Sequence, residues 1–213
     1  MADSHSLVAH HFDTLEQQRD ASRLGMWTFL ATEVLFFGGL FAAYVVYRAG
    51  YPDIFSAAGG RLNVLLGTLN TVVLLTSSLT VALAVHAATE HRRRQMILLL
   101  LTTMGLAVLF LGIKGFEYYI DYEEGLIPGA NFHWEGADAA RAQLFFTLYF
   151  IMTGLHALHM IIGIAVAGVM VYLSTRGWYD QEPMPIELFG LYWHFVDVVW
   201  IFLFPLLYLI DRS

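Results

Sequence analysis

A carboxyl group lies in the middle of an apolar stretch near the start of the sequence. Glu33 belongs to the run FLATEVLFFGG, which contains no other ionisable residue. A charge at the centre of a bilayer costs at least about 2.5–3.5 kcal/mol on insertion scales, so this carboxyl is expected to be neutral or paired. As a functional group it would form a proton, gas or lipid-linked site. As a structural group it would fix helix packing, with Gly38 and Gly39 permitting close contact.

Two histidines occur together in a later apolar stretch. His156 and His159 lie in GLHALHMIIG, and a spacing of three residues places both on one helix face. Imidazoles are metal and haem ligands, and His86 and His194 would be the ligands from other stretches. The pair equally suits hydrogen bonds between helices. Because Glu33 and this pair would each otherwise lack a partner, we expect Glu33 to hydrogen-bond His156 or His159.

A third polar pair lies near the end of the chain. His194 and Asp197 belong to YWHFVDVVWIFLF, and their spacing allows the carboxylate to accept a hydrogen bond from the imidazole. Such a pair orients a metal ligand in some proteins, and in others it fixes the register of packed helices. Trp193 and Trp200 are seven residues apart and share a helix face.

The run GIKGFEYY closes another apolar stretch with charged and aromatic residues. Lys114 and Glu117 have the spacing of a helical ion pair, and Tyr118 and Tyr119 suit a membrane interface. These residues would serve as snorkelling anchors or contact lipid headgroups. The candidates for contact with lipid or with a protein interface are Lys114, Glu117, Tyr118, Tyr119, Trp193 and Trp200.

None of these groups amounts to a catalytic or metal site. The sequence contains no phosphate-binding glycine loop and no set of nucleophile, base and orienting residue. It also contains no cysteine, which excludes disulfides, thiolate metal sites and a cysteine nucleophile. His5, His10 and His11 suggest a metal site near the N-terminus, but a solvated terminal segment is the simpler interpretation. We therefore expect no catalytic residue and no bound metal in this chain.

The composition indicates how these residues are positioned. Of 213 residues, 58% are hydrophobic and 14% are charged, and the mean hydropathy is +0.60, whereas soluble domains are about 45–50% apolar and about 25% charged. This excludes a soluble single domain, and the net charge of −7 argues against nucleic acid as a partner. A bilayer core needs about 20 apolar residues per helix. The sequence predicts an all-α membrane bundle, with a polar segment over residues 1–23 and a five-helix domain over 24–213, its helices at about 24–47, 62–86, 95–119, 142–173 and 186–210.

Arginines near the predicted helix ends favour one orientation. With the N-terminus in the cytoplasm, six arginines lie inside and four outside, and the inside set includes the run Arg92–Arg94. Positive residues are enriched on the cytoplasmic side of membrane proteins. We therefore expect a cytoplasmic N-terminus and a C-terminus on the outer, periplasmic side.

Four motifs in the same order resemble subunit III of the haem–copper oxidases, specifically of cytochrome c oxidase. They are EVLFFGG at 33–39, FEYY at 116–119, GLHALHMIIG at 154–163 and YWHFVDVVWIFLF at 192–204. The likeness extends along nearly the whole chain. Larger members of that family have seven helices, so the five helices predicted here resemble the short bacterial form. The glutamate in TEVLFF is closer to the cytochrome c oxidase pattern than to the aspartate of some quinol oxidases, which favours cytochrome c as electron donor.

The resemblance implies an accessory subunit of a proton-pumping oxidase in the bacterial inner membrane. Haem and copper would belong to partner subunits, and this chain would carry no redox cofactor and no catalytic centre of its own. It would contact subunit I directly, assemble with subunit II and other subunits, hold phospholipid, and aid proton uptake or oxygen access. The alternatives are a quinol oxidase or nitric oxide reductase component, an independent haem-binding membrane protein, or a small transporter with Glu33 as proton relay.

Overall fold

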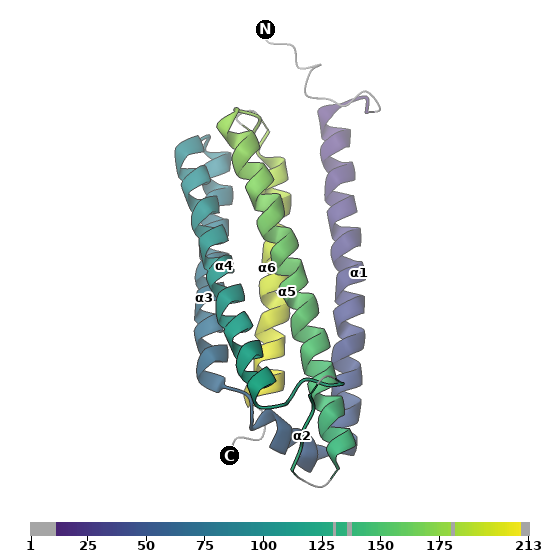
Figure 1. The fold of residues 1–213 in the computed structure, drawn as a ribbon. Coiled ribbons are helices and arrows are strands. Elements are labelled where there is room, and N and C mark those ends of the chain that lie inside the picture. Colours follow the sequence, from purple (N-terminus) through teal and green to yellow (C-terminus); the bar gives the residue numbers. More distant parts are fainter. Residues whose placement is uncertain (1–11, 130, 136–137, 180–181, 210–213) are drawn as a thin grey trace.

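The computed structural model describes residues 12–129, 131–135, 138–179 and 182–209, and all regular elements in these ranges are helical. Five helices in the described ranges are long and apolar enough to cross a membrane, which confirms the predicted all-α membrane bundle (Figure 1). The predicted histidine cluster at His5, His10 and His11 lies outside the described residues. The elements are α1 (Leu15–Gly50), α2 (Pro52–Gly59), α3 (Val64–Thr89), α4 (Arg93–Glu123), α5 (Ala139–Thr175), α6 (Met184–Phe204) and the π-helical turn η2 (Pro205–Leu209).

The first helix begins well before the predicted membrane span. Helix α1 starts at Leu15, where the hydroxyl of Thr14 accepts a hydrogen bond from the Gln17 amide at 3.1 Å. Such a cap satisfies one of the free amides at a helix start. The polar residues between Leu15 and Leu24 include good helix formers, so α1 extends out of the apolar region without a break. Hydropathy predicts where the apolar, lipid-contacting segment of α1 begins. The helix itself begins earlier, at Leu15.

Two proline residues explain two further differences from the predicted segments. The connection after α1 contains the unpredicted short helix α2, with Pro52 in its first turn, where its fixed backbone angle suits a helix and its missing amide costs nothing. At the other end of the chain, α6 ends at Phe204 and continues as the wider turn η2 from Pro205. A proline inside a helix removes one backbone hydrogen bond, and the wider turn accommodates that loss.

Helices α3 to α6 form a four-helix bundle, and α1 lies against one edge of it (Figure 1). Helix α4 packs on α3 and α5, and α6 packs on the same two helices, so α4 and α6 are diagonal. Helix α1 contacts α5 and α6, and its most apolar segment is the least buried among those of the five long helices. This arrangement leaves most of the surface of α1 open to lipid or another protein.

Glycine permits close helix packing at Gly163, but not at the predicted positions Gly38 and Gly39. A Cβ atom at Gly163 would lie 2.8 Å from the Trp193 ring, so α5 and α6 approach each other there only because this position has no side chain. A Cβ atom at Gly38 or Gly39 would meet no other atom of the described residues within 4 Å. The close contact expected beside these two glycines is therefore not made within the described part of this chain.

An ion pair ties the start of α1 to the connection between α5 and α6. Arg19 donates to both carboxylate oxygens of Glu182, with contacts of 2.6 and 3.1 Å to Oε2 and 3.3 Å to Oε1. We expect Arg19→Gln to weaken this attachment by about 0.2–1 kcal/mol, because the arginine is partly exposed to solvent. Amide hydrogen exchange in the first turns of α1 should become a few-fold faster. Arg23→Gln, which removes an exposed arginine from the same helix, is the matched control, and equal exchange in the two variants would contradict a role for the pair.

Candidate functional site

Glu33 and His159 form a hydrogen-bonded pair between α1 and α5. The distance from His159 Nε2 to Glu33 Oε2 is 3.1 Å, and both side chains are largely buried, at 13% and 18% exposed for His159 and Glu33. This confirms the predicted contact of Glu33 with a histidine of GLHALHMIIG and selects His159. The bond joins the outlying helix α1 to the bundle near mid-membrane.

The contact made by the second ring nitrogen of His159 limits where protons can lie in the Glu33–His159 pair. Nδ1 lies 2.8 Å from the carbonyl oxygen of Leu155, and a carbonyl only accepts, so Nδ1 carries a proton. The contact between Nε2 and Oε2 then holds one proton, which belongs either to a neutral glutamic acid or to a charged imidazole facing a carboxylate. Both forms have no net charge and the same number of protons. The pair can therefore remain in an apolar region without a further counter-ion.

Aromatic groups support His159 on two sides. The ring of Phe37 lies 5.3 Å from the imidazole in an edge-on arrangement, and the hydroxyl of Tyr192 donates to the His159 carbonyl at 2.9 Å. These contacts come from α1 and α6, so three helices meet at His159. The imidazole itself is held toward Glu33 by the Phe37 ring and by the contact of Nδ1 with the Leu155 carbonyl.

Two apolar hollows flank the pair along α1. One, of about 360 Å³, is lined by Met26, Phe29, Ile162, Val166, Met170, Pro185, Leu188, Phe189 and Tyr192, from α1, α5 and α6. The other, of about 240 Å³, is lined by Val34, Phe37, Gly38, Phe41, Phe195, Val198, Val199 and Phe202, from α1 and α6. Their linings are almost entirely apolar, so they suit acyl chains or side chains of a partner rather than water.

His156 does not take part in this pair, although it is three residues from His159. It is 1% exposed, and neither ring nitrogen has a hydrogen-bond partner in the described residues. Its ring lies 5.4 Å from Phe110 and 5.1 Å from Trp200. Three residues of helix turn side chains by about 300°, which leaves them about 60° apart. That angle is enough to place His159 toward α1 and His156 inside the bundle.

The predicted bond between His194 and Asp197 is not formed in the described part of the chain. His194 Nδ1 lies 2.8 Å from the hydroxyl of Ser78 in α3. Asp197 is 3% exposed, and neither of its carboxyl oxygens has a hydrogen-bond partner among these residues, although Ser78 on α3 is its polar neighbour. The small side chain of Ser78 brings a hydroxyl close to the imidazole, so the histidine bonds across the helix interface rather than along its own helix.

Trp193 and Trp200 are buried, which corrects their assignment to a lipid or protein interface. Both are 1% exposed. The Trp193 indole donates to the Ser77 hydroxyl at 3.2 Å, and the Trp200 indole donates to the Thr71 hydroxyl at 3.1 Å. Small hydroxyl residues on α3 thus provide both the space and the acceptors that let the indoles turn inward.

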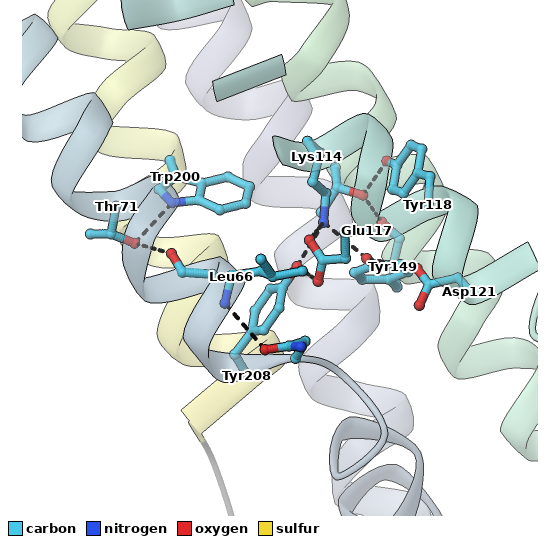
Figure 2. A network of polar contacts seen from close by, with 12 residues as sticks. Leu66, Thr71, Lys114, Glu117, Tyr118, Asp121, Tyr149, Trp200 and Tyr208 are labelled. Carbon is cyan, nitrogen blue, oxygen red and sulfur yellow. Dashed lines mark hydrogen bonds and ion pairs between the residues drawn. The ribbon is translucent and has the colours of Figure 1, made fainter. Parts of the chain in front are cut away.

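Lys114 and Glu117 also face inward, so they are not snorkelling anchors. Their predicted ion pair is confirmed at 2.9 Å, but the two residues are 2% and 1% exposed. Figure 2 shows Lys114 at the centre of a buried network, where it donates to the hydroxyls of Tyr149 and Tyr208 at 2.9 and 2.6 Å. Tyr208 in turn donates to Glu117 at 2.7 Å. The lysine stays inside because all its donors find acceptors there.

The remaining tyrosines of GIKGFEYY have separate positions. The hydroxyl of Tyr118 lies 2.7 Å from that of Thr153 on α5, so this half-buried residue extends the network toward α5. Tyr119 is 60% exposed and remains a candidate for lipid contact. The Tyr149 hydroxyl donates to Asp121 at 3.1 Å, which carries the network toward the end of α4.

Sequence reasoning missed several members of the buried network. Tyr149 and Thr153 precede the predicted candidate His156 by seven and three residues on α5, and this polar stripe is a signal that could have revealed these two residues. Asp121 lies beyond the predicted end of its helix, and Tyr208 lies past Pro205. Among the described residues, no group of three or more histidine and carboxylate residues is placed to hold a metal ion.

Comparison with known proteins decides the family. Residues 4–211 match the sequence profile of cytochrome c oxidase subunit III. This chain belongs to the cytochrome c oxidase subunit III family. Cytochrome c oxidase subunit 3 of Thermostichus vulcanus is 33% identical over 202 residues, which are 94% of this chain and 92% of the relative. Quinol oxidase subunit 3 of Bacillus spizizenii is 32% identical over 204 residues, which are 92% and 91% of the two chains.

A third relative has a different organisation. The haem–copper oxidase subunit I+III of Aeropyrum pernix is 32% identical over 201 residues, which are 90% of this chain and 23% of the relative. The subunit III family includes both cytochrome c oxidase and quinol oxidase members, and its members are accessory subunits without redox cofactors of their own. With its five long apolar helices, this subunit III is a multi-pass membrane protein.

Proposed function

We propose that this subunit III associates directly with subunit I of a haem–copper oxidase and stabilises it during turnover. The fused relative supports this association, because its name places subunits I and III in one chain. The observation that carries the stabilising role is the Glu33–His159 bond. It fixes the outlying helix α1 to the bundle while the apolar hollows on either side of it stay open.

The hollows beside α1 favour lipid binding as part of this role. Both are lined by apolar side chains and lie between helices in the membrane-spanning part of the chain. Acyl chains held there would fill the space between α1 and the bundle. In this proposal the bound lipid and α1 together support subunit I, and they aid proton uptake or oxygen access to it without contributing a redox group.

Orientation and electron donor belong to the same proposal. Arginines at the α3–α4 turn, at the start of α1 and after α5 lie at one end of the bundle, which favours a cytoplasmic N-terminus and an outer C-terminus in a bacterial inner membrane. Glu33 favours cytochrome c as donor to the complex. Mass spectrometry of co-purifying subunits, with a haem assay, tests the association with subunits I and II, and a quinol-type subunit II would overturn the donor.

We predict that Glu33→Ala leaves the initial rate of oxygen reduction near that of the unsubstituted complex. The loss should appear as activity that declines faster during turnover and as less subunit III after purification, because a bond between membrane helices contributes about 1–2 kcal/mol. Glu33→Gln is the control, since its amide can donate to Nε2 of His159. Immediate loss of haem reduction in a fully assembled Glu33→Ala complex would contradict an accessory role.

A further inference from the structure

His194 presents a polar atom without a partner among the described residues, near the middle of the apolar span Met184–Leu209. It lies ten residues after Met184 in α6, about 15 Å along the helix axis at 1.5 Å per residue. Its Nδ1 is bonded to Ser78, but no described residue hydrogen-bonds Nε2. His194 is only partly buried, and Nε2 is not among the buried side-chain atoms that lack a hydrogen-bond partner, so this nitrogen is open to the surface of the chain.

Lipid does not suit such an atom. Unsatisfied polar groups in the hydrocarbon region are strongly unfavourable, because acyl chains offer neither donors nor acceptors. Hydroxyls on the exposed faces of other helices avoid this cost by donating to their own backbone. Thr28, Thr76 and Thr102 donate to the carbonyls of Leu24, Val72 and Leu98 at 2.8, 2.8 and 2.9 Å. A histidine ring cannot bond to its own helix in this way through Nε2 while Nδ1 bonds Ser78.

The surface around His194 has the character of a helix-binding face. Exposed apolar side chains lie on the same two helices, at Leu75 and Leu79 of α3 and Val198 of α6. Val198 also lines the 240 Å³ hollow between α6 and α1, so the face continues into a depression. An apolar surface with one central hydrogen-bonding group is what a membrane helix with one polar side chain would complement.

We propose that this α3–α6 face, centred on His194, docks against a transmembrane helix of subunit I that carries a hydrogen-bonding side chain at mid-membrane. The inference rests on the proposed association with subunit I, and it adds which face makes the contact. The outer face of α4 is diagonal to α6 in the bundle, so it faces away from subunit I in this arrangement.

Cross-linking tests the position of the face, and the absence of native cysteine makes it direct. Leu79→Cys and Val198→Cys, each labelled with a thiol-reactive photo-cross-linker in the assembled oxidase, should form a product that joins this chain to subunit I. Leu101→Cys and Leu109→Cys, which are similarly exposed on α4, should not. Cross-links to subunit I from α4, or none from the α3–α6 face in a complex that contains subunit I, would overturn the proposal. If subunit I does not co-purify with the unsubstituted chain, the proposed association itself fails.

A substitution tests the hydrogen bond. His194→Leu in the oxidase complex should lower the retention of subunit I after detergent washing by about tenfold, the effect of one bond between membrane helices. His194→Gln should restore most of the retention, because its amide can bond both Ser78 and the partner. Thr102→Val on α4 is the control and should change nothing. Retention with His194→Leu equal to that of the control would overturn the role of His194.

Discussion

Lys114→Met is expected to lower the free energy of unfolding of this subunit by about 3–5 kcal/mol. Removing one partner of a buried ion pair leaves the other charge uncompensated, and this is the cause of the large loss. In this case Glu117 loses its ion-pair partner, and Tyr149 and Tyr208 lose the donor that their hydroxyls accept from. Thermal unfolding in detergent, followed by far-ultraviolet circular dichroism, measures the change.

A double variant separates charge from packing. Lys114→Met combined with Glu117→Gln removes both charges but keeps an acceptor for the Tyr208 hydroxyl, so it should recover most of the lost stability. If the double variant is as unstable as Lys114→Met, the loss comes from the altered packing of the lysine side chain. Near-wild-type stability of Lys114→Met alone would contradict the buried network.

Trp200→Ala is the second change for which we expect a large effect, a loss of about 3–5 kcal/mol. The indole lies 4.8 Å from the Phe110 ring and 5.1 Å from the His156 ring, measured between centroids. Its removal leaves a cavity beside an imidazole that has no hydrogen-bond partner among the described residues, and it leaves the Thr71 hydroxyl without its indole donor. The measurement is the unfolding temperature of the purified chain in detergent.

Two further substitutions serve as controls for the stability of Trp200→Ala. Trp200→Phe keeps most of the ring volume and loses only the indole donor, so it should cost about 1–2 kcal/mol. Trp178→Ala, at a tryptophan that is 67% exposed, should change stability by less than about 0.5 kcal/mol. A similar small effect for Trp178→Ala and Trp200→Ala would show that the ring of Trp200 does not support the bundle.

Lys114 and Trp200 belong to one structural unit at the C-terminal end of α6. Lys114 Nζ lies 4.6–5.6 Å from the centroids of four aromatic rings, those of Tyr118, Tyr149, Trp200 and Tyr208. Because Tyr208 belongs to η2, this unit fixes the turn after Pro205 to α4 and α5. The wide turn is thus supported by side chains from two other helices.

The predicted contacts that the structure confirms are those with few alternatives. Glu33 is a lone carboxyl in an apolar stretch, and a histidine pair on another helix was the obvious partner, so the bond was predictable up to the choice between His156 and His159. The choice itself was not, because about 60° of helix rotation separates the two positions. Only the packing of α1 against α5 determines which histidine faces Glu33.

The direction of the charged and aromatic residues was not predictable for a different reason. In a soluble helix the apolar side marks the core, but in a membrane helix the lipid-facing side is just as apolar. The sequence around Lys114, Glu117 and Trp193 therefore contains no signal that separates inside from outside. Interface residues and core residues have the same types, and their assignment to lipid contact was wrong for this reason.

Hydropathy and motif order were sufficient to predict the number and approximate limits of the membrane helices, the family, and some of the polar residues that form contacts within the spans. These properties need no knowledge of neighbours in space. The packed bundle was needed to learn that Glu33 pairs with His159, that Lys114 is enclosed, and that His194 bonds Ser78 and leaves one nitrogen facing outward. Each of these depends on the rotation of one helix against another, and a uniformly apolar helix does not encode that rotation in its own pattern.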